Sequence, residues 1–415
     1  MKNRFKKNEI LRCFQSKMNE NFEGYYDLDG NKIIVQGLLD DEDAEIKIVK
    51  PGLKVSFGII KDLIRKSPYR VSDKFNNNGE LDHCDYDYEV KFKQILLSKL
   101  FDRDLKYISS ELENYRNKVF LPSKIVNDEL QIGLYKRNSH EVLPYNFENS
   151  VVSVKMNDCL KFIVNILNED LKFIKNSVKG IYLRGENCAF QAGILVSQLF
   201  SIDDRVLQKF INNGIDSLFA YLNDSGNSIL VKDPYFFTEK DYSILKIKET
   251  DFKLRPESFF QLNSHIASKI VDKIKDYCRN LDFEIVYDLF AGVGFLSHFI
   301  EGSHRILFEI TEGAFKYSKK DNTEFYYGDI DSTSISMNKN SLMIVDPPRK
   351  GVGDKCIDII REFTPKHLIY LSCNPISLKN DLSKIDDLYD LVDITGFDMF
   401  PRTPHIETLT FLKRR

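Results

Sequence analysis

Short apolar runs recur through the C-terminal part of the chain, separated by longer polar or amphipathic stretches. The runs cover 285–290, 306–310, 342–346 and 367–372. Buried parallel strands have this continuous apolar character because both faces of their sheet are covered. An amphipathic stretch at 264–278 precedes them and predicts a helix. The alternation predicts an α/β fold with a doubly wound, Rossmann-like sheet, closed by an antiparallel hairpin from the runs at 392–399 and 408–412.

The N-terminal segment has a different pattern, in which apolar and polar positions alternate over short runs between residues 21 and 71. Asp29 and Gly30 form a strong hairpin signal, and Pro51 and Gly52 separate two further runs. Several short strands in so short a segment predict a small β-barrel. The pattern does not distinguish an RNA-binding barrel from a β module with no binding role.

The middle of the chain, from 72 to 254, mixes both periodicities. Helical spacing occurs at 87–100 and 159–171, and strand-like runs occur at 130–135, 179–184 and 228–231. These predict an α+β domain, to which the pattern assigns no chemistry.

Composition narrows the class of protein. A charged content of 29% and a hydrophobic content of 42% are ordinary for a globular protein. No apolar run approaches the roughly 18 residues of a membrane span, and the basic N-terminus precedes no signal-peptide core, so a cytoplasmic protein is predicted. The seven cysteines are scattered without a Cys-x-x-Cys pair, which indicates reduced thiols. A net charge of −3 neither indicates nor excludes a local basic face.

A glycine turn follows the first apolar run. Gly292 and Gly294 come after Phe290, where glycines let the backbone approach a ligand at the carboxyl edge of the sheet. Glu309 ends the next strand, at an offset that suits an acid bonding ribose hydroxyls. Asp329 follows a further short strand, where a carboxylate can accept from an adenine amino group. Each acid alone is typical of a solvated loop, but together and in this order they predict a nucleoside cofactor.

Two further strand ends carry reactive side chains. Asp346 precedes two prolines, which fix the backbone and hold its carboxylate at the ligand-binding edge. Cys373 is followed by Asn374 and Pro375, so its thiol is expected at the same edge, although burial is the default for cysteine. A thiolate there can attack carbon 6 of a uracil ring and make carbon 5 nucleophilic toward a methyl group. Arg349 is a candidate to assist its ionisation.

A late carboxylate completes the chemistry. Removal of the carbon-5 proton after methyl transfer requires a general base, and Glu407 is the candidate. His405 is the second candidate, since it would share a face with Glu407 if both lay on one strand. The alternative interpretation of Glu407 is a surface carboxylate on a strand.

Taken jointly and in order, five segments resemble motifs of the RNA uridine-5-methyltransferases, which form 5-methyluridine in tRNA and rRNA. They are 258–263, 288–294, 346–351, 372–375 and 397–407. The resemblance implies S-adenosylmethionine as cofactor, Cys373 as nucleophile and Glu407 as base. The residues that it implies around the cofactor and uracil are Gln261, Phe290, Phe295, Glu309, Asp329 and Asp346, beside the glycine turn. Phe295 departs from the Asn or Thr usual at its position.

The rest of the chain resembles other parts of the same family. The N-terminal segment is similar to the small RNA-binding barrel of the rRNA-acting members, and 131–140 to the central domain. The resemblance implies three domains, at 1–72, 73–255 and 256–415. Many rRNA-type members carry a cysteine-rich iron–sulfur site after the barrel. This chain has only Cys84 in that region, which predicts no iron–sulfur cluster.

Together these features predict a monomeric enzyme that forms 5-methyluridine in large-subunit (23S) rRNA, on a uridine swung out of its stack. Three alternatives stay open. One is the same reaction on the T-loop uridine of tRNA. Another is methylation of an adenine amino group, which needs no cysteine. The last is a non-catalytic RNA-binding protein on a methyltransferase scaffold.

Overall fold

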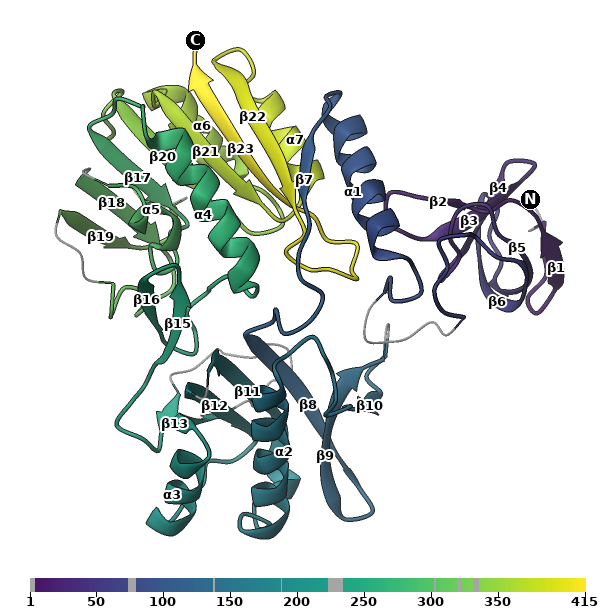
Figure 1. The fold of residues 1–415 in the computed structure, drawn as a ribbon, viewed down its shortest axis with the longest axis horizontal. Coiled ribbons are helices and arrows are strands. Elements are labelled where there is room, and N and C mark those ends of the chain that lie inside the picture. Colours follow the sequence, from purple (N-terminus) through teal and green to yellow (C-terminus); the bar gives the residue numbers. More distant parts are fainter. Residues whose placement is uncertain are drawn as a thin grey trace. The chain divides into compact units, whose positions relative to one another are not determined.

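The computed structural model describes residues 4–73, 80–136, 139–187, 189–222, 234–301, 304–318, 322–330 and 336–415. Two compact units make up the chain (Figure 1). Met1–Ser109 and Phe400–Ile406 form the first unit, and Ser110–Met399 and Glu407–Arg415 form the second. Within the described ranges, no helix is both long and apolar enough to cross a membrane.

The first unit contains a sheet in the order β1-β5-β6-β4-β3-β2. Its strands are β1 (Ile10–Cys13), β2 (Lys17–Met18), β3 (Gly24–Leu28), β4 (Asn31–Val35), β5 (Asp43–Lys50) and β6 (Val55–Arg65). The predicted hairpin turn at Asp29 and Gly30 joins β3 to β4, with φ of 47° and 82°. The alternate inward residues Ile33 and Val35 of β4 and Ala44, Ile46 and Ile48 of β5 are buried together.

Helix α1 (Tyr86–Phe101) and the short strand β7 (Lys106–Ile108) follow in the same unit. Asp85 caps α1 by accepting from the backbone N–H of Tyr88. The side chains of Glu89 and Lys93, one turn apart on α1, form a fully buried ion pair at 2.7 Å. Glu89 also accepts from the backbone N–H of Arg402 at 2.9 Å. This buried network therefore ties the segment Phe400–Ile406 to α1.

The second unit contains two larger sheets. The first has the order β10-β9-β8-β11-β12-β13-β14, with α2 (Val154–Glu169) and α3 (Asp204–Asn212) packed on it around a shared apolar core (Figure 1). Its strands are β8 (Lys118–Val126), β9 (Glu129–Tyr135), β10 (Val142–Pro144), β11 (Val178–Glu186), β12 (Ala189–Val196), β13 (Ile215–Leu222) and β14 (Tyr235–Phe236). A 3-10 turn, Lys175–Ser177, leads into β11. The predicted strand at 228–231 lies outside the described residues.

The second sheet of this unit runs β19-β18-β17-β20-β21-β23-β22. Its strands are β17 (Ile285–Leu289), β18 (His304–Glu309), β19 (Thr323–Tyr327), β20 (Ser341–Val345), β21 (His367–Ser372), β22 (Tyr389–Phe397) and β23 (Glu407–Arg414). The first five are parallel, and β23 pairs antiparallel with both β21 and β22. The α/β class and the mixed, doubly wound sheet are therefore confirmed.

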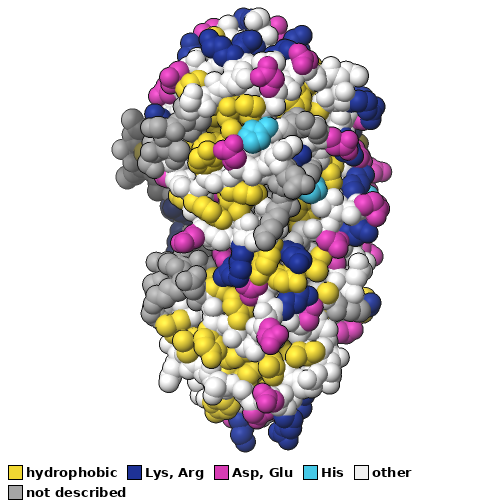
Figure 2. Space-filling view, turned by 90° about the vertical axis from the view of Figure 1, so that its left-hand side faces the viewer, with side chains coloured by type: hydrophobic (Ala, Val, Ile, Leu, Met, Phe, Trp, Pro, Cys, Tyr) yellow, Lys and Arg dark blue, Asp and Glu magenta, His cyan; other side chains and the backbone are white. Residues whose placement is uncertain are grey.

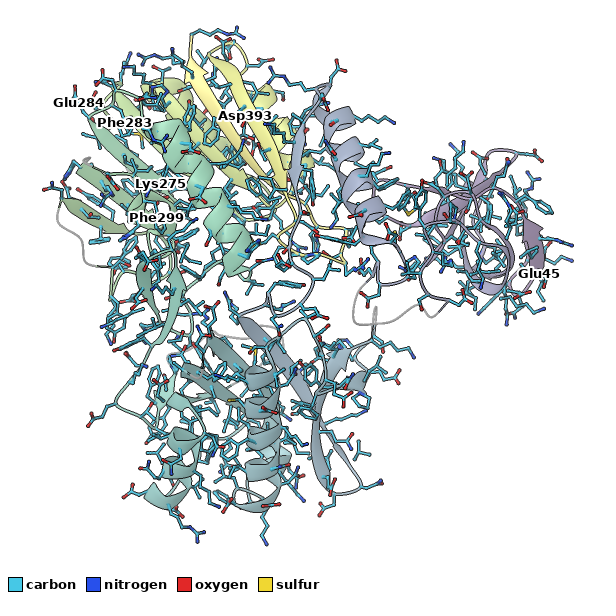
Figure 3. All side chains as sticks on the ribbon, in the orientation of Figure 1. Glu45, Lys275, Phe283, Glu284, Phe299 and Asp393 are labelled. Atoms are coloured by element: carbon cyan, nitrogen blue, oxygen red, sulfur yellow. The ribbon has the colours of Figure 1, made fainter. Side chains whose placement is uncertain are left out.

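Helices and a hairpin accompany this sheet. They are α4 (Ser264–Cys278), α5 (Phe295–His298), α6 (Gly353–Phe363), α7 (Pro375–Ser383), and β15 (Ser243–Ile247) paired with β16 (Thr250–Leu254). Asn263 caps α4, which matches the predicted helix. Lys273 of α4 donates to the carboxylate of Asp393 on β22, labelled in Figure 3, at 2.7 Å. On the face seen in Figure 2, basic side chains occur in small groups between acidic and apolar ones.

The sheet differs from the predicted pattern in its connections. Helix α5 has only four residues, and the described part of the connection from β18 to β19 consists of turns. Gly313, with φ of 83°, lies in that connection, and glycine disfavours a regular helix there. β18 and β19 therefore have less helical cover than the alternating pattern predicts.

Candidate active site

The carboxyl ends of three parallel strands meet at one edge of the second sheet. Leu289 of β17 pairs with Val345 of β20, which pairs with Tyr370 of β21. The residues that follow these strands therefore emerge side by side. Ligands bind at this edge in open α/β sheets, and the predicted site residues Asp346 and Cys373 are both located there.

A small recess opens beside the first two strand ends. Among the residues that line it are the predicted Gln261, Phe290, Gly292, Phe295 and Asp346. The side-chain amide of Gln261 donates to Oδ2 of Asp346 at 3.3 Å, which joins the segment before α4 to the end of β20. Phe290 has φ of 66°, which is uncommon outside glycine and indicates a functional constraint on this turn.

Two carboxyl groups in the recess carry shifted pKa values. Asp288 is 1% exposed, and its Oδ2 has no hydrogen-bond partner among the described residues. Burial raises the pKa of Asp288 to about 7, against the lowering effect of hydrogen bonds from Ser297. Burial, together with the charge of Asp288, raises the pKa of Asp346 to about 8. The recess can therefore bind a positively charged group or a group that donates hydrogen bonds.

The glycine turn is held by the acid at the end of the neighbouring strand. Oε2 of Glu309 accepts from the backbone N–H of Gly292, and Oε1 accepts from that of Thr311, both at 2.8 Å. Asp329 is exposed after β19, where the preceding N–H of Gly328 donates to the carbonyl of Glu309 at 3.0 Å. Both acids thus lie at the predicted edge, and Glu309 contacts the turn itself.

Gly294 and Phe295 lie at the start of α5. Gly294 has φ of 77°, and an added Cβ there would lie 2.6 Å from Cδ2 of Leu307. Phe295 is buried, with its ring packed against those of Phe252, Phe260 and Phe299. Its position in an aromatic cluster explains how a large ring is accommodated beside the turn.

Cys373 lies in a loop that other side chains hold in place. It is half-buried between β21 and α7, and Asn374 caps α7 by accepting from the N–H of Ile376. Burial raises the pKa of the Cys373 thiol to about 11, with further increases from Glu407 and Asp346 and an opposing effect of Arg349. Arg349, the candidate for assisting ionisation of the thiol, lowers this pKa, but its effect is smaller than that of burial.

The register of the antiparallel pair brings the last predicted residue to the same place. Ser372 of β21 pairs with Thr408 of β23, so the next positions outward are Cys373 and Glu407. Glu407 is 4% exposed, and burial and the charge of Asp346 raise its pKa well above the usual value. β23 begins at Glu407, so His405 precedes the strand and the two residues do not share a strand face.

Comparison with known proteins bears on this arrangement. The family model described as tRNA (Uracil-5-)-methyltransferase matches residues 314–415, which include Asp346, Cys373 and Glu407. An uncharacterized RNA methyltransferase of Fusobacterium nucleatum is 26% identical over 94% of this chain and 92% of its own length. Another, of Oceanobacillus iheyensis, is 26% identical over 98% of this chain and 97% of its own.

The C-terminal part of this chain thus matches the tRNA (uracil-5-)-methyltransferase family, and nearly the whole chain is similar to RNA methyltransferases. These similarities identify the chain as an RNA methyltransferase. Its fold is also that of a crystal structure, the Pyrococcus abyssi tRNA (uracil-54, C5)-methyltransferase in complex with S-adenosyl-L-homocysteine. That likeness has a TM-score of 0.77 at 22% identity and covers 97% of this chain and 100% of the other.

The methyltransferase has two site features that the sequence analysis did not select. Asp288 precedes the glycine turn within an apolar run. A single acidic residue near the end of a buried strand is the signal that could have marked it as a site residue. Asp381 of α7 accepts from the backbone N–H of Val352 at 3.0 Å and from the hydroxyl of Tyr370 at 2.7 Å. It thereby fastens the loop after Asp346 to α7, and no local pattern marks that role.

Proposed function

We propose that the methyltransferase acts through a covalent adduct between Sγ of Cys373 and carbon 6 of a target uracil, with Glu407 as general base. The observation that carries this proposal is the β21–β23 register, which sets Cys373 beside Glu407 at the edge that holds the glycine turn. A nucleophile and a general base on adjacent strands can act on the same uracil ring, the nucleophile at carbon 6 and the base on the carbon-5 proton.

The proposed steps balance in atoms and electrons. The thiolate of Cys373 forms a bond to carbon 6, and the electron pair of the ring double bond makes carbon 5 nucleophilic. Bound S-adenosylmethionine would supply the methyl group to carbon 5, and the electron pair of the broken sulfur–methyl bond would stay on sulfur as S-adenosylhomocysteine leaves. Glu407 then takes the carbon-5 proton, the double bond reforms, and the bond between sulfur and carbon 6 breaks.

The raised pKa values suit these roles. A carboxylate with a raised pKa is a stronger base than that of an exposed glutamate, and burial raises the pKa of Glu407. The pKa of Cys373, about 11, keeps the thiol protonated at neutral pH. Positive charge in the recess would lower the pKa of Asp346, Glu407 and Cys373 together, so ionisation of the thiol would follow occupation of the site.

The recess fits a cofactor of mixed polar and aromatic character. The buried Oδ2 of Asp288, which has no partner in the described part of the chain, offers an acceptor, and Phe290 and Phe295 offer apolar surface. We propose that the cofactor is held by the residues that the sequence predicts, which are Gln261, Phe290, Gly292, Gly294, Phe295, Glu309, Asp329 and Asp346. Glu309 would then exchange its bond to the Gly292 N–H for bonds to ligand hydroxyls.

The RNA substrate has two candidates. The small N-terminal β-sheet unit favours large-subunit rRNA, as the sequence predicts. The family model and the similar crystal structure are both named for tRNA, which favours the T-loop uridine of tRNA. That crystal structure covers 97% of this chain, so the N-terminal unit supports rRNA less strongly than the sequence alone suggests.

The test is incubation of the full chain with tritium-methyl S-adenosylmethionine and either unmodified tRNA or unmodified rRNA, followed by nucleoside mass spectrometry. Label in 5-methyluridine from one RNA identifies the substrate. A Cys373→Ala variant should bind the cofactor normally and transfer no label. Full transfer by that variant would contradict the adduct and select amino-group methylation.

Three further properties of the proposal have simple checks. A monomer is expected in sedimentation equilibrium. No iron–sulfur cluster is expected. Iron and sulfide contents that amount to one cluster per chain in anaerobically purified protein would contradict this. RNA binding should weaken steeply with added salt if lysine and arginine side chains neutralise phosphates, and a flat response would contradict a phosphate clamp.

A further inference from the structure

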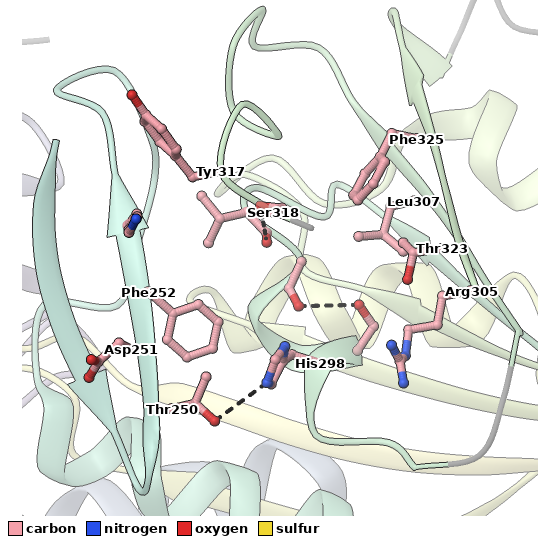
Figure 4. Close-up of a pocket in the computed structure, with 14 residues that line it drawn as sticks. Thr250, Asp251, Phe252, His298, Arg305, Leu307, Tyr317, Ser318, Thr323 and Phe325 are labelled. Atoms are coloured by element: carbon pink, nitrogen blue, oxygen red, sulfur yellow. Dashed lines mark hydrogen bonds between the residues drawn. The ribbon is translucent and has the colours of Figure 1, made fainter. Parts of the chain in front are cut away.

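A second cavity adjoins the glycine turn. It opens between β16, α5 and the strands β18 and β19 (Figure 4), and its empty volume, including the part open to solvent, is about 540 Å³. Val293 lines both spaces, whereas Gly294, Leu307 and Phe325 line only this one. The short α5 and the turns after β18 leave this face of the sheet without a longer helix over it.

Two side chains on neighbouring strands point into this cavity. Arg305 of β18 and Thr323 of β19 are direct partners in the parallel register, and both line the space (Figure 4). Leu307 and Phe325, two residues further along each strand, form the next pair on the same face. The pairing therefore places the basic side chain of Arg305 beside the hydroxyl side chain of Thr323, next to an apolar pair on the same face of the sheet.

Both of these side chains have hydrogen-bonding atoms that are buried and unused. Arg305 is 4% exposed, and its Nη2 donates to the carbonyl of Ile300 at 2.9 Å. Its Nε and Nη1 have no partner among the described residues, and neither does the buried Oγ1 of Thr323. Buried polar groups are paired in the great majority of cases, so this cluster of unused donors needs an explanation.

The positive charge of Arg305 is a second reason to expect a partner for these buried donors. A guanidinium group stays protonated in proteins, although burial lowers the pKa of Arg305 from its usual value. A buried cation without a counter-charge is strongly unfavourable. No salt bridge to Arg305 occurs among the described residues. An anion in the cavity would supply the counter-charge.

The other polar groups of the cavity are mostly engaged with the protein. The hydroxyls of Ser297 and Ser318 donate to the carbonyls of Gly294 and Val293, and Nε2 of His298 lies 3.4 Å from Oγ1 of Thr250. Asp251, which is acidic, and Lys253, which is basic, also line the cavity, and both are exposed. The unused donors are therefore concentrated at Arg305 and Thr323.

We propose that this cavity is a binding site for a compact oxyanion, a phosphate or carboxylate group, held by Nε and Nη1 of Arg305 and by the hydroxyl of Thr323. Guanidinium and hydroxyl donors match oxygen acceptors of this kind, and charge-assisted hydrogen bonds are the stronger class. The site is separate from the proposed cofactor recess and does not depend on the proposed methylation chemistry.

The test is a titration of inorganic phosphate into the full chain without S-adenosylmethionine, followed by calorimetry and by thermal unfolding. Ionic strength is held constant with sodium chloride, and a parallel titration uses acetate. Saturable binding and a rise in Tm are expected for the unmodified chain with at least one of the two anions. Phosphate alone would indicate a phosphate ester as ligand, and acetate alone a carboxylate.

Variants separate this site from general salt effects. Arg305→Met should weaken anion binding by at least about tenfold, as loss of a charge-assisted bond implies, and Thr323→Val should weaken it several-fold in a nearly isosteric background. Arg279→Met, which removes an exposed arginine after α4, should leave binding unchanged. Equal binding by Thr323→Val, Arg305→Met and the unmodified chain, or no saturable binding to either anion, would overturn the proposal.

Discussion

The side-chain amide of Asn374 donates a hydrogen bond to the backbone carbonyl oxygen of Arg349 across 3.0 Å. This contact ties the loop after β20, which begins at Asp346, to the loop that carries Cys373. The hydroxyl of Ser377 donates to the same carbonyl at 2.8 Å. Asn374, which also caps α7, therefore sets the distance between the proposed nucleophile Cys373 and the carboxyl group of Asp346.

Asn374→Ser should slow methyl transfer with little change in stability. Serine retains an oxygen that can cap α7, so a stability change below about 1 kcal/mol is expected, but its side chain is too short to reach the carbonyl of Arg349. Misplacement of the nucleophile should lower kcat by roughly tenfold or more, with KM for RNA nearly unchanged. A variant with normal kcat in single-turnover assays would show that this contact does not position Cys373.

Glu407→Gln should trap the covalent RNA adduct. If Glu407 removes the carbon-5 proton, its amide can no longer do so, and methylated RNA should remain attached to Cys373. The adduct is measured as labelled RNA that stays with the protein in a denaturing gel. The double variant Glu407→Gln with Cys373→Ala should form none, and turnover by the single variant at the normal rate would assign the base elsewhere.

Glu407→Gln should also lower the pKa of Cys373. Burial is the main cause of the raised value, about 11, and Glu407 is the second. Because only the thiolate reacts, alkylation of Cys373 by iodoacetamide should rise with pH without a plateau below about pH 10, and the variant should react faster at every pH at which Glu407 is ionised. Glu362→Gln, on the exposed side of α6, is the matched control. Unchanged rates would show that Glu407 has no electrostatic effect on the thiol.

Asp288→Asn should stabilise the protein at neutral and higher pH. The folded-state pKa of Asp288, about 7, is above that of an unfolded aspartate, so its carboxyl group favours folding below about pH 4 and loses this contribution as pH rises through 7. Removing the ionisable group should raise the free energy of unfolding by roughly 1–4 kcal/mol at pH 8. The gain, measured by urea unfolding, should shrink toward pH 5, and a pH-independent difference would contradict this cause.

Glu89→Gln should destabilise the first unit strongly. The carboxylate of Glu89 is fully buried and pairs with Lys93 at 2.7 Å and with Arg402 at 3.5 Å, so its replacement by an amide removes a buried negative charge that two cations share. A loss of roughly 3–5 kcal/mol is expected in thermal or urea unfolding. Glu45→Gln is the matched control, because Glu45 pairs with Lys61 on the exposed side of the sheet and should cost less than about 1 kcal/mol. Similar losses in both variants would mean that the buried charge is not the cause.

The sequence by itself determined the local elements and their chemistry. Apolar runs predict β17, β18, β20 and β21, and the helical pattern after Asn263 predicts α4, because backbone propensity, capping and side-chain period act over a few residues. The placement of Asp346 and Cys373 at strand ends follows from the same local information, since parallel strands all end at one edge.

Only the tertiary structure decided which of these residues meet. Glu407 reaches Cys373 because β23 inserts beside β21 in an antiparallel register, and a shift of one residue would turn it to the other face. The segment Phe400–Ile406 belongs to the first unit although it directly precedes Glu407. The unused donors of Arg305 and Thr323 likewise depend on how β18 and β19 pair. Register and long-range pairing are set by packing between segments distant in sequence, and no local pattern contains them.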